Sequence, residues 1–272
     1  MKFSILVVSL NPQDELKKTL KSIEEQSFKD YEVIVKDGGS TDQSLLCLKE
    51  FEGKMNLRLE ISKDKGIYDG MNQAVLLARG DYVYFLNCGD YFSTPYVLEN
   101  IASRIENAKS HSENSGNRYI FYGNIFERLT NNVVSSNPRM DAFGCYRHVP
   151  CHQACFYDRT LVAEHPFDTD YKVRADYEQF LWCFFEAKAE PVYTGILIAD
   201  YEGGGFSEQN QKISNKEHKV ITSKYMTKKE LFKYKTIMII TLAPLRTAIA
   251  KNPKTAKVYN FIKKNLYKVR MK

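Results

Sequence analysis

Polar residues follow apolar runs at four places in the first 90 residues of the sequence. They are Ser9 and Asn11, then Asp37 with Gly38 and Gly39, then residues 63–66, and finally residues 87–90. The carboxylate of Asp37 can accept hydrogen bonds from a base or a ribose, and Lys65 can neutralise a phosphate. The glycines let a ligand approach the backbone. These residue types predict a nucleotide site, although DGGS alone is more often only a turn and a helix cap.

The segment FLNCGDYF, residues 85–92, ends an apolar run with one carboxylate, that of Asp90. A carboxylate in this place can hold a divalent cation. Mg²⁺ commonly binds through one or two carboxylates and completes its coordination with phosphate oxygens and waters. Asp90 is therefore a candidate ligand of a divalent cation.

The elements that position these residues form a repeating pattern of strands and helices. Residues 4–8 and 31–37 are continuous apolar runs typical of strands buried on both faces. Between them, Leu16, Leu20 and Ile23 share one face of a helix. A helix over 42–51, a strand over 57–62, a helix over 70–78 and a strand over 81–87 follow. Since ligands bind at the carboxyl ends of parallel strands, the four polar groups should meet at one edge of a mostly parallel sheet.

The pattern becomes less regular after about residue 96. Residues 97–108 and 175–187 are predicted helices, whereas residues 119–129 and 152–158 have the composition of strands. We predict an α/β fold in three parts. Residues 1–95 form a nucleotide-binding half, residues 96–211 form a second half of the same domain, and residues 212–272 form a basic helical tail.

Charge is distributed unevenly along the chain. The net charge is +6, yet residues 212–272 hold 17 Lys and Arg residues against two acids, which leaves 22 basic and 31 acidic residues elsewhere. A basic tail with interleaved aromatic residues could bind nucleic acid or an anionic membrane surface. The apolar run TIMIITLAPL, residues 236–245, has about half the length of a membrane-spanning helix and favours the membrane surface. The alternative is a solvated pair of helices that covers the rest of the protein.

The cysteines and the N-terminal segment predict a cytoplasmic protein. Six cysteines without a CxxC pair fit a reducing compartment, and MKFSILVVSLNPQDEL lacks the pattern of a signal peptide.

Two other kinds of site were weighed. His148, Cys151, His152 and Cys155 could together bind zinc, but their spacing does not match a zinc finger. In an extended strand, residue 152 would also point away from residues 151 and 155. A dinucleotide-binding site is excluded because SLNPQDE, which follows the first strand, does not contain GxGxxG.

Two longer segments resemble the family-2 glycosyltransferases of bacterial polysaccharide synthesis. They are SILVVSLN with LKKTLKSIEEQSFKDYEVIVKDGGSTDQS, and further on SKDKGIYDGMNQAVLLARGDYVYFLNCGD. They are most similar to the branch that carries DKGIYDxMN and LNxGD. The resemblance is close over residues 3–95 and looser around residues 150–156, 174–181 and 200–207. It implies a GT-A fold, a nucleotide-diphosphate sugar donor, a divalent metal ion and inversion at the anomeric carbon.

The resemblance also implies roles for individual residues. The donor would be bound by Ser9, Asn11, Asp37, Gly38, Asp64, Lys65, Asn72, Asn87 and Cys88. Asp90 would bind Mg²⁺ or Mn²⁺, because residues 87–90 stand where the family has its DxD signature and retain one acid. The diphosphate would supply further ligands, so the affinity for the metal should be lower without the nucleotide. Asp176 would deprotonate the acceptor hydroxyl, although its spacing alone favours a helix cap. Contacts to the acceptor or the diphosphate would come from His152, Gln153, Gly204 and Ser207, within residues 96–211, which would be the acceptor-binding half. The last two lie in a glycine-rich segment that would close over the diphosphate.

We therefore predict an inverting glycosyltransferase that extends a saccharide acceptor, linked to a lipid, for a capsule, O-antigen or exopolysaccharide. The donor would be a nucleotide-diphosphate sugar, foremost a UDP-sugar. The tail would hold the enzyme at the inner face of the plasma membrane, and no nucleic acid would be bound. A sugar nucleotidyltransferase is a rival, but it should carry a glycine-rich phosphate loop after the first strand. A catalytically silent sugar-nucleotide-binding or scaffold subunit is a second alternative, suggested by the reduced segment NCGD.

Overall fold

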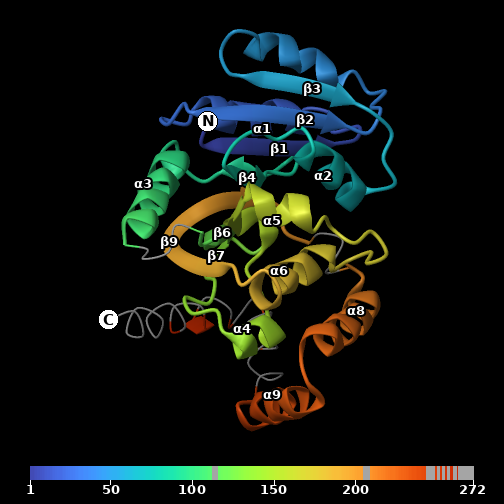
Figure 1. Cartoon of the computed structure of the whole chain (residues 1–272). Helices are drawn as coiled ribbons and strands as arrows, with labels where there is room; N and C mark the ends of the chain where they lie inside the picture. The colour runs from blue at the N-terminus through green and yellow to red at the C-terminus, as the bar shows by residue number, and fades with distance from the viewer. Residues whose placement is uncertain are drawn as a thin grey trace.

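The N-terminal half of the protein alternates strands and helices. The structure is a computed structural model that describes residues 1–111, 116–204 and 209–242, with a few isolated positions from 249 to 262. The elements of the N-terminal half are β1 (Phe3–Ser9), α1 (Glu15–Glu24), β2 (Tyr31–Asp37), the 3₁₀ helix η1 (Ser44–Phe51), β3 (Leu57–Ile61), α2 (Ile67–Val75) and β4 (Tyr82–Phe85). β1 is parallel to β2 and β4, and β2 is parallel to β3 (Figure 1). The four predicted strands and their parallel arrangement are confirmed, so their carboxyl ends lie at one edge of the sheet.

The second half completes the same sheet. Its elements are β5 (Tyr91–Phe92), α3 (Val97–Ser110), β6 (Tyr119–Glu127), β7 (Asn132–Val134), α4 (Ala142–Arg147), the 3₁₀ turn η2 (His152–Ala154), β8 (Cys155–Asp158), α5 (Arg159–Glu164), α6 (Ala175–Phe185) and β9 (Glu190–Tyr201). The strand order is β3-β2-β1-β4-β8-β6-β9-β5, with β7 paired to β6. β8 is antiparallel to β4, whereas β6 is parallel to β9. The two predicted halves therefore share one continuous sheet.

β6 and β9 are joined through an irregularity that requires glycine. The register of the pair shifts between Tyr122 and Asn124, on either side of Gly123. A Cβ atom at Gly123 would lie 2.3 Å from the carbonyl oxygen of Ile196. No other residue fits there without moving β9, so this glycine fixes how β9 curves across the second half.

Apolar side chains form a separate core on each face of the sheet. Successive strand residues point to opposite faces, so Ile5 and Val7 enter one core and Leu6 enters the other. The first core packs α1, η1 and α3 against the sheet, and the second packs α2, α5, α6 and α8. The result is a layered α/β architecture with helices on both faces.

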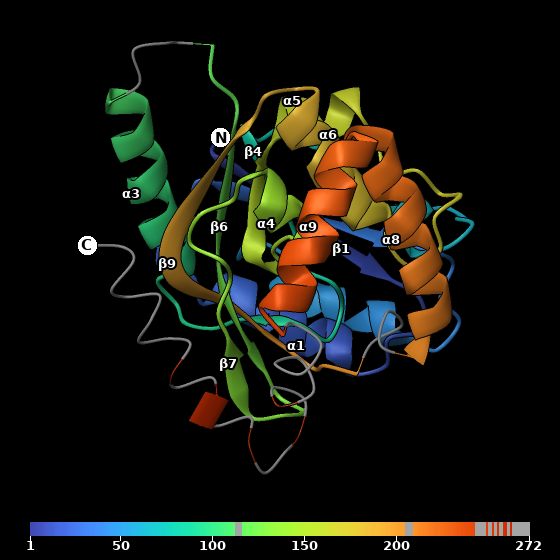
Figure 2. The same ribbon diagram turned by 90° about the horizontal axis from the view of Figure 1, so that it is seen from below.

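Two C-terminal helices, α8 (Gln211–Tyr225) and α9 (Lys228–Ile240), pack against the second half. Ile221 of α8 is fully buried, and the ring of Tyr234 in α9 lies 5.4 Å from that of Phe143 and 5.5 Å from that of Tyr146 in α4. Seen from below, α8 and α9 lie across α6 and α4 (Figure 2). The part of the predicted tail that the structure describes is helical, and α8 belongs to the globular body.

Three predicted elements differ in type or in bounds. The predicted helix 42–51 is a 3₁₀ helix that begins at Ser44, after Gln43 in the left-handed region with φ 63°. The helix predicted over 70–78 begins earlier, at Ile67, and the Asp69 carboxylate in its first turn accepts a hydrogen bond of 2.8 Å from the amide of Lys65, which precedes the helix. Residues 152–154 form a 3₁₀ turn, so the predicted strand 152–158 begins only at Cys155.

Candidate active site

The loops after β1 and β2 are fastened together by the Asp37 carboxylate. Its Oδ2 accepts hydrogen bonds from the hydroxyls of Ser9 (2.9 Å) and Ser40 (2.6 Å), and its Oδ1 accepts from the amides of Gly39 (2.9 Å) and Ser40 (2.6 Å). Burial alone would raise the pKa of Asp37, but these bonds outweigh it and lower the pKa. Asn11 adds a bond from the Thr41 amide to its Oδ1 (2.8 Å). Ser9, Asn11 and Asp37, which are predicted to bind the donor, therefore lie close together. Asp37 is fully buried and holds the loop after β2 in place. Its contact with a nucleoside stays a prediction.

A buried lysine supports the next loop. Lys36 is fully buried, and its Nζ donates to the Asp64 carboxylate (3.2 Å) and to the carbonyls of Ser62 and Asp37. Asp64 lies against Gly38, where a Cβ atom would come 2.8 Å from its Oδ2. Gly38 and Asp64 are thus neighbours, as expected for two donor-binding residues. Lys36 was missed, although a lysine inside a strand buried on both faces is a signal in itself, since its charge must find a partner there.

Three other predicted donor contacts differ in their surroundings. Lys65 is exposed at the edge of the sheet. Asn72 uses both groups of its amide on the backbone of Phe167, with two bonds of 2.8 Å, and so ties α2 to the loop before α6. Cys88 packs against the first core, where burial raises the pKa of its thiol to about 12. A donor contact by Asn72 or Cys88 would require these interactions to be exchanged.

Asp90 lies nearly enclosed at the middle of the same edge. It is 7% exposed, and Gln153 Nε2 donates to its Oδ2 at 3.1 Å. Burial raises the pKa of Asp90 to about 6, although Gln153, His152 and Arg128 act in the opposite direction. A buried carboxylate with so high a pKa lacks a matching positive charge, which a divalent cation would supply.

The donors around Asp90 fit a hard cation that brings most of its own ligands. In the part of the chain that the structure describes, no three His, Cys, Asp or Glu side chains converge on one point. Asp90 would therefore hold Mg²⁺ or Mn²⁺ together with phosphate oxygens and waters. The same observation shows that the alternative of a zinc site at His148, Cys151, His152 and Cys155 is wrong, since all four are among the described residues.

His152 and Asp176 meet beside Asp90. His152 Nδ1 lies 3.1 Å from Asp176 Oδ2, and His152 Nε2 lies 3.0 Å from Asn87 Nδ2. Asp176 Oδ1 accepts from the Tyr177 amide (2.8 Å) and from the Tyr68 hydroxyl (3.3 Å). The side chains of His152 and Asp176 are 15% and 26% exposed, so a ligand can reach both. Residues from the loop after β4, from η2 and from α6 thus converge at the carboxyl edge.

Asp176 is an ionised carboxylate and does not cap its helix. The N-cap of α6 is Arg174, which makes no side-chain cap bond. Burial alone would raise the pKa of Asp176, but the hydrogen bonds from His152 and from the Tyr177 amide lower it. Asp176 is therefore not the N-cap residue of α6, although it accepts from the amide of Tyr177 in the first turn, and its carboxylate is available to accept a proton at neutral pH.

The sequence over residues 4–165 matches the family model described as Glycosyl transferase family 2. The chain belongs to this family. A PGL/p-HBAD biosynthesis glycosyltransferase of Mycobacterium bovis is 33% identical over 209 residues, which cover 75% of this chain and 78% of that protein. The amylovoran biosynthesis glycosyltransferase AmsB of Erwinia amylovora is 28% identical over 191 residues, covering 65% of this chain and 62% of AmsB.

Solved structures show that this family-2 glycosyltransferase has the GT-A fold. S. aureus TarS 1-349 in complex with UDP-GlcNAc superposes with a TM-score of 0.62 at 21% identity, over 75% of this chain and 59% of TarS 1-349. The mannosyltransferase PcManGT of Pyrobaculum calidifontis, in complex with GDP-Man and Mn²⁺, gives a TM-score of 0.61 at 15% identity, over 98% of this chain and 82% of PcManGT.

Arg128 is a further residue of the glycosyltransferase site that sequence reasoning missed. Its guanidinium donates to the carbonyl of Gly89 (2.7 Å) and to the carboxylate of Asp200 (2.8 Å), and it lies 4.6 Å from the ring of Tyr91. It therefore joins the loop that carries Asp90 to β9. No local signal marks it, since its partners lie far from it in the sequence.

The predicted glycine-rich segment of the glycosyltransferase is described only in part. Gly204 adopts φ +67°, in the left-handed region, and its carbonyl accepts from Gln209 Nε2 at 3.0 Å. Ser207 lies outside the described residues. Closure of this segment over a diphosphate stays a prediction.

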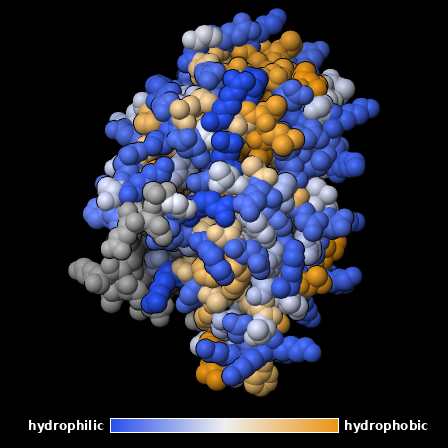
Figure 3. All heavy atoms as spheres, in the orientation of Figure 1, coloured by the Kyte–Doolittle hydropathy of each residue, from blue (hydrophilic) through white to orange (hydrophobic). Residues whose placement is uncertain are grey.

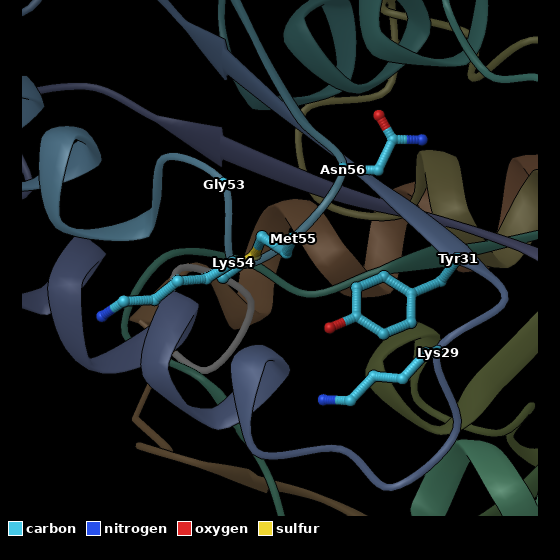
Figure 4. A pocket seen from close by; sticks show the side chains of 6 residues that line it. All are labelled: Lys29, Tyr31, Gly53, Lys54, Met55 and Asn56. Carbon is cyan, nitrogen blue, oxygen red and sulfur yellow. The ribbon is translucent and has the colours of Figure 1, made fainter.

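Two surface pockets lie away from His152 and Asp176. One, of about 440 Å³, is lined by Lys29, Tyr31, Gly53, Lys54, Met55 and Asn56 (Figure 4). Tyr31 begins β2 and Asn56 precedes β3, so this pocket lies at the amino end of the strands, opposite the edge where His152 and Asp176 meet. The other, of about 430 Å³, is bordered by Gln13 and Asp42, in the loops after β1 and β2, and by Cys47 of η1.

Proposed function

We propose that this family-2 glycosyltransferase moves a sugar from a nucleotide-diphosphate donor, foremost a UDP-sugar, to a hydroxyl of a saccharide acceptor with inversion. The observation that carries the proposal is the meeting of Asp176, ionised and partly exposed, with the loop of Asp90 at the carboxyl edge of the sheet. A base and an anchor for the diphosphate are the two groups that this transfer needs.

Each residue would have a defined part in the reaction. Asp176 accepts the proton of the acceptor hydroxyl while that oxygen attacks the anomeric carbon. The bond from this carbon to the diphosphate oxygen breaks on the opposite side, which inverts the configuration. When bound at Asp90, the divalent cation supplies positive charge for the departing diphosphate. Gln153 keeps the Asp90 carboxylate in place through its bond of 3.1 Å.

The acceptor and the location of the enzyme belong to the same proposal. Two relatives are named for the biosynthesis of PGL/p-HBAD and of amylovoran, which supports a role in a cell-surface polysaccharide such as a capsule or O-antigen. A lipid-linked acceptor would favour an enzyme that lies on the inner face of the plasma membrane. On α9, Phe232 and Ile240 are 75% and 74% exposed among lysines, which supports contact with an anionic bilayer. Among the residues that the structure describes, no helix is long and apolar enough to cross a membrane.

Release of nucleoside diphosphate from a panel of UDP-, GDP- and dTDP-sugars with Mn²⁺ or Mg²⁺ tests the proposal. One donor should be consumed, Asp90→Ala should abolish its metal-dependent turnover, and Asp176→Asn should lower kcat by about 10²- to 10⁴-fold. Asp81→Asn, an exchange at an exposed aspartate, is the control and should change neither. If a donor binds regardless of Asp90 and none is consumed, the chain is a sugar-nucleotide-binding subunit without transferase activity.

A further inference from the structure

The hydrogen bonds around His152 fix which of its nitrogens carries the proton. The amide nitrogen of Asn87 can only donate, so His152 Nε2, 3.0 Å away, must accept. The proton of the neutral ring is then on Nδ1, which lies 3.1 Å from Asp176 Oδ2 and donates to it. Asn87, His152 and Asp176 thus form one directed chain of hydrogen bonds.

The two oxygens of Asp176 have different surroundings. Oδ1 accepts from the Tyr177 amide at 2.8 Å and from the Tyr68 hydroxyl at 3.3 Å. For Oδ2, His152 is the hydrogen-bond donor among the described side chains. Since a carboxylate oxygen has two lone pairs, Oδ2 retains one that can receive a proton. The bonds on both oxygens together prevent the carboxylate from rotating.

We propose that Asn87 and His152 are positioning residues that orient Asp176 for proton abstraction. The inference rests on the proposed function and adds the residues that control its base. His152 holds Oδ2 in a fixed direction, and the amide of Asn87 keeps His152 in the tautomer that can do so. A misplaced catalytic group can cost about a hundredfold in rate, so the orientation of this base matters even though His152 takes no proton itself.

The other end of the Asn87 amide supports this role. Asn87 Oδ1 is buried without a hydrogen-bond partner among the described residues. The Asn87 amide is therefore held by the bond from its nitrogen to His152. Its Oδ1 remains a buried hydrogen-bond acceptor, to which a hydroxyl of a bound sugar would donate. A carboxylate at position 87 could not donate to a neutral His152 Nε2, so the amide and the histidine act as a pair.

Steady-state kinetics of His152→Leu and His152→Asn test the proposal. His152→Leu removes the bond to Asp176 and should lower kcat by about 10- to 100-fold, with the donor KM unchanged within about twofold. The asparagine side chain keeps an N–H near the position of Nδ1, so His152→Asn should recover most of kcat. His165→Leu is the matched control, because His165 also contacts a carboxylate of α6, with its Nε2 2.9 Å from Glu178 Oε2, but lies outside the site. It should lower the melting temperature and leave kcat unchanged.

Proton-detected ¹⁵N NMR of the histidine rings provides a measurement that does not depend on activity. The wild type should show His152 protonated at Nδ1, and Asn87→Leu should weaken this preference. The positioning role would be refuted if His152→Leu kept the kcat of the wild type, including the case in which the exchange raises only the KM for the donor. If no donor is turned over by the wild type while the Nδ1 tautomer is observed, the proposed function fails and the hydrogen-bonded chain stands without it.

Discussion

At the scale of single residues, Asp90 destabilises the metal-free protein. Its pKa rises from 3.8 to about 6 on folding, which corresponds to roughly 3 kcal/mol. The folded state binds this proton more tightly than the unfolded state, so the penalty is absent below about pH 4 and complete above about pH 6. In the presence of a chelator, Asp90→Asn should therefore raise the free energy of unfolding at pH 7.5 by roughly 2–3 kcal/mol, as measured by urea denaturation, and by little at pH 4.

Added metal should reverse this order. With Mn²⁺ and UDP, the melting temperature of the wild type should rise by more than that of Asp90→Asn, which lacks the metal ligand. The exposed Asp81→Asn should change neither quantity. A wild type as stable as Asp90→Asn at pH 7.5 without metal would contradict the raised pKa.

The residues of the site could be predicted from the sequence more readily than their partners. Asn87, Asp90, His152, Gln153 and Asp176 do come together, because strand ends and a helix start must meet at one edge. The pairing of His152 with Asp176 depends on the register of β8 against β4, which no local pattern encodes.

At the scale of elements, α8 is held against α6, the helix that carries Asp176, by a buried acid of α6. Glu178 is fully buried, and its carboxylate accepts from His165 (2.9 Å), Lys224 (2.6 Å) and Tyr225. Burial alone would raise the pKa of Glu178, but these bonds outweigh it and hold the pKa at about 2, below the ordinary 4.5. This contributes roughly 3 kcal/mol that is present above about pH 4.5 and is lost as the pH falls toward 2.

Glu178→Gln should therefore lower the free energy of unfolding at pH 7 by about 3 kcal/mol, and by much less near pH 2.5. Denaturant unfolding at the two pH values measures the difference. Glu186→Gln, an exposed glutamate just after the same helix, is the control and should have little effect at either pH. An equal loss at both pH values would mean that packing, and not the charge, fastens α8.

Helices that carry such contacts are difficult to place from sequence. An acid of α8 itself, Glu217, accepts from the amides of Lys172 (2.8 Å), Val173 (3.1 Å) and Arg174 (2.9 Å), just before α6 begins. In the sequence Glu178 of α6 and Glu217 of α8 resemble ordinary solvent-facing charges, and α8 therefore resembled the start of a basic tail. The 3₁₀ character of η1 was missed for a similar reason, because apolar spacing does not distinguish 3₁₀ from α over two turns.

At the scale of the whole molecule, α9 presents a surface suited to an anionic bilayer. Phe232, Ile239 and Ile240 are 75%, 61% and 74% exposed. Lys228, Lys229, Lys233 and Lys235 lie on the same helix, and apolar and hydrophilic residues adjoin at the lower end of the view in Figure 3. Each lysine near such a surface contributes about 1 kcal/mol, and the apolar side chains add insertion.

The full chain should float with vesicles that contain an anionic phospholipid and less with purely zwitterionic ones. Exchange of Phe232, Ile239 and Ile240 for serine should lower the bound fraction several-fold, and added salt should lower it further. Serine at Leu46 and Leu76, which are exposed on the other half, is the control and should leave binding unchanged. If the wild type, the α9 variant and the control variant all float equally, α9 is not the segment that contacts the membrane.

The sharing of one sheet by both halves also has a consequence while the chain is being synthesised. β4 ends at Phe85, whereas its antiparallel partner β8 begins at Cys155. Tyr82 of β4 pairs with Asp158 of β8, so this pairing is complete only after Asp158 has been added to the chain. At about 5–20 residues per second, a ribosome needs roughly 4–15 seconds to add that stretch. During this interval the edge of β4 is unpaired and open to association with other nascent chains. Protection of the β4 edge therefore has to wait until residues of the second half have been synthesised.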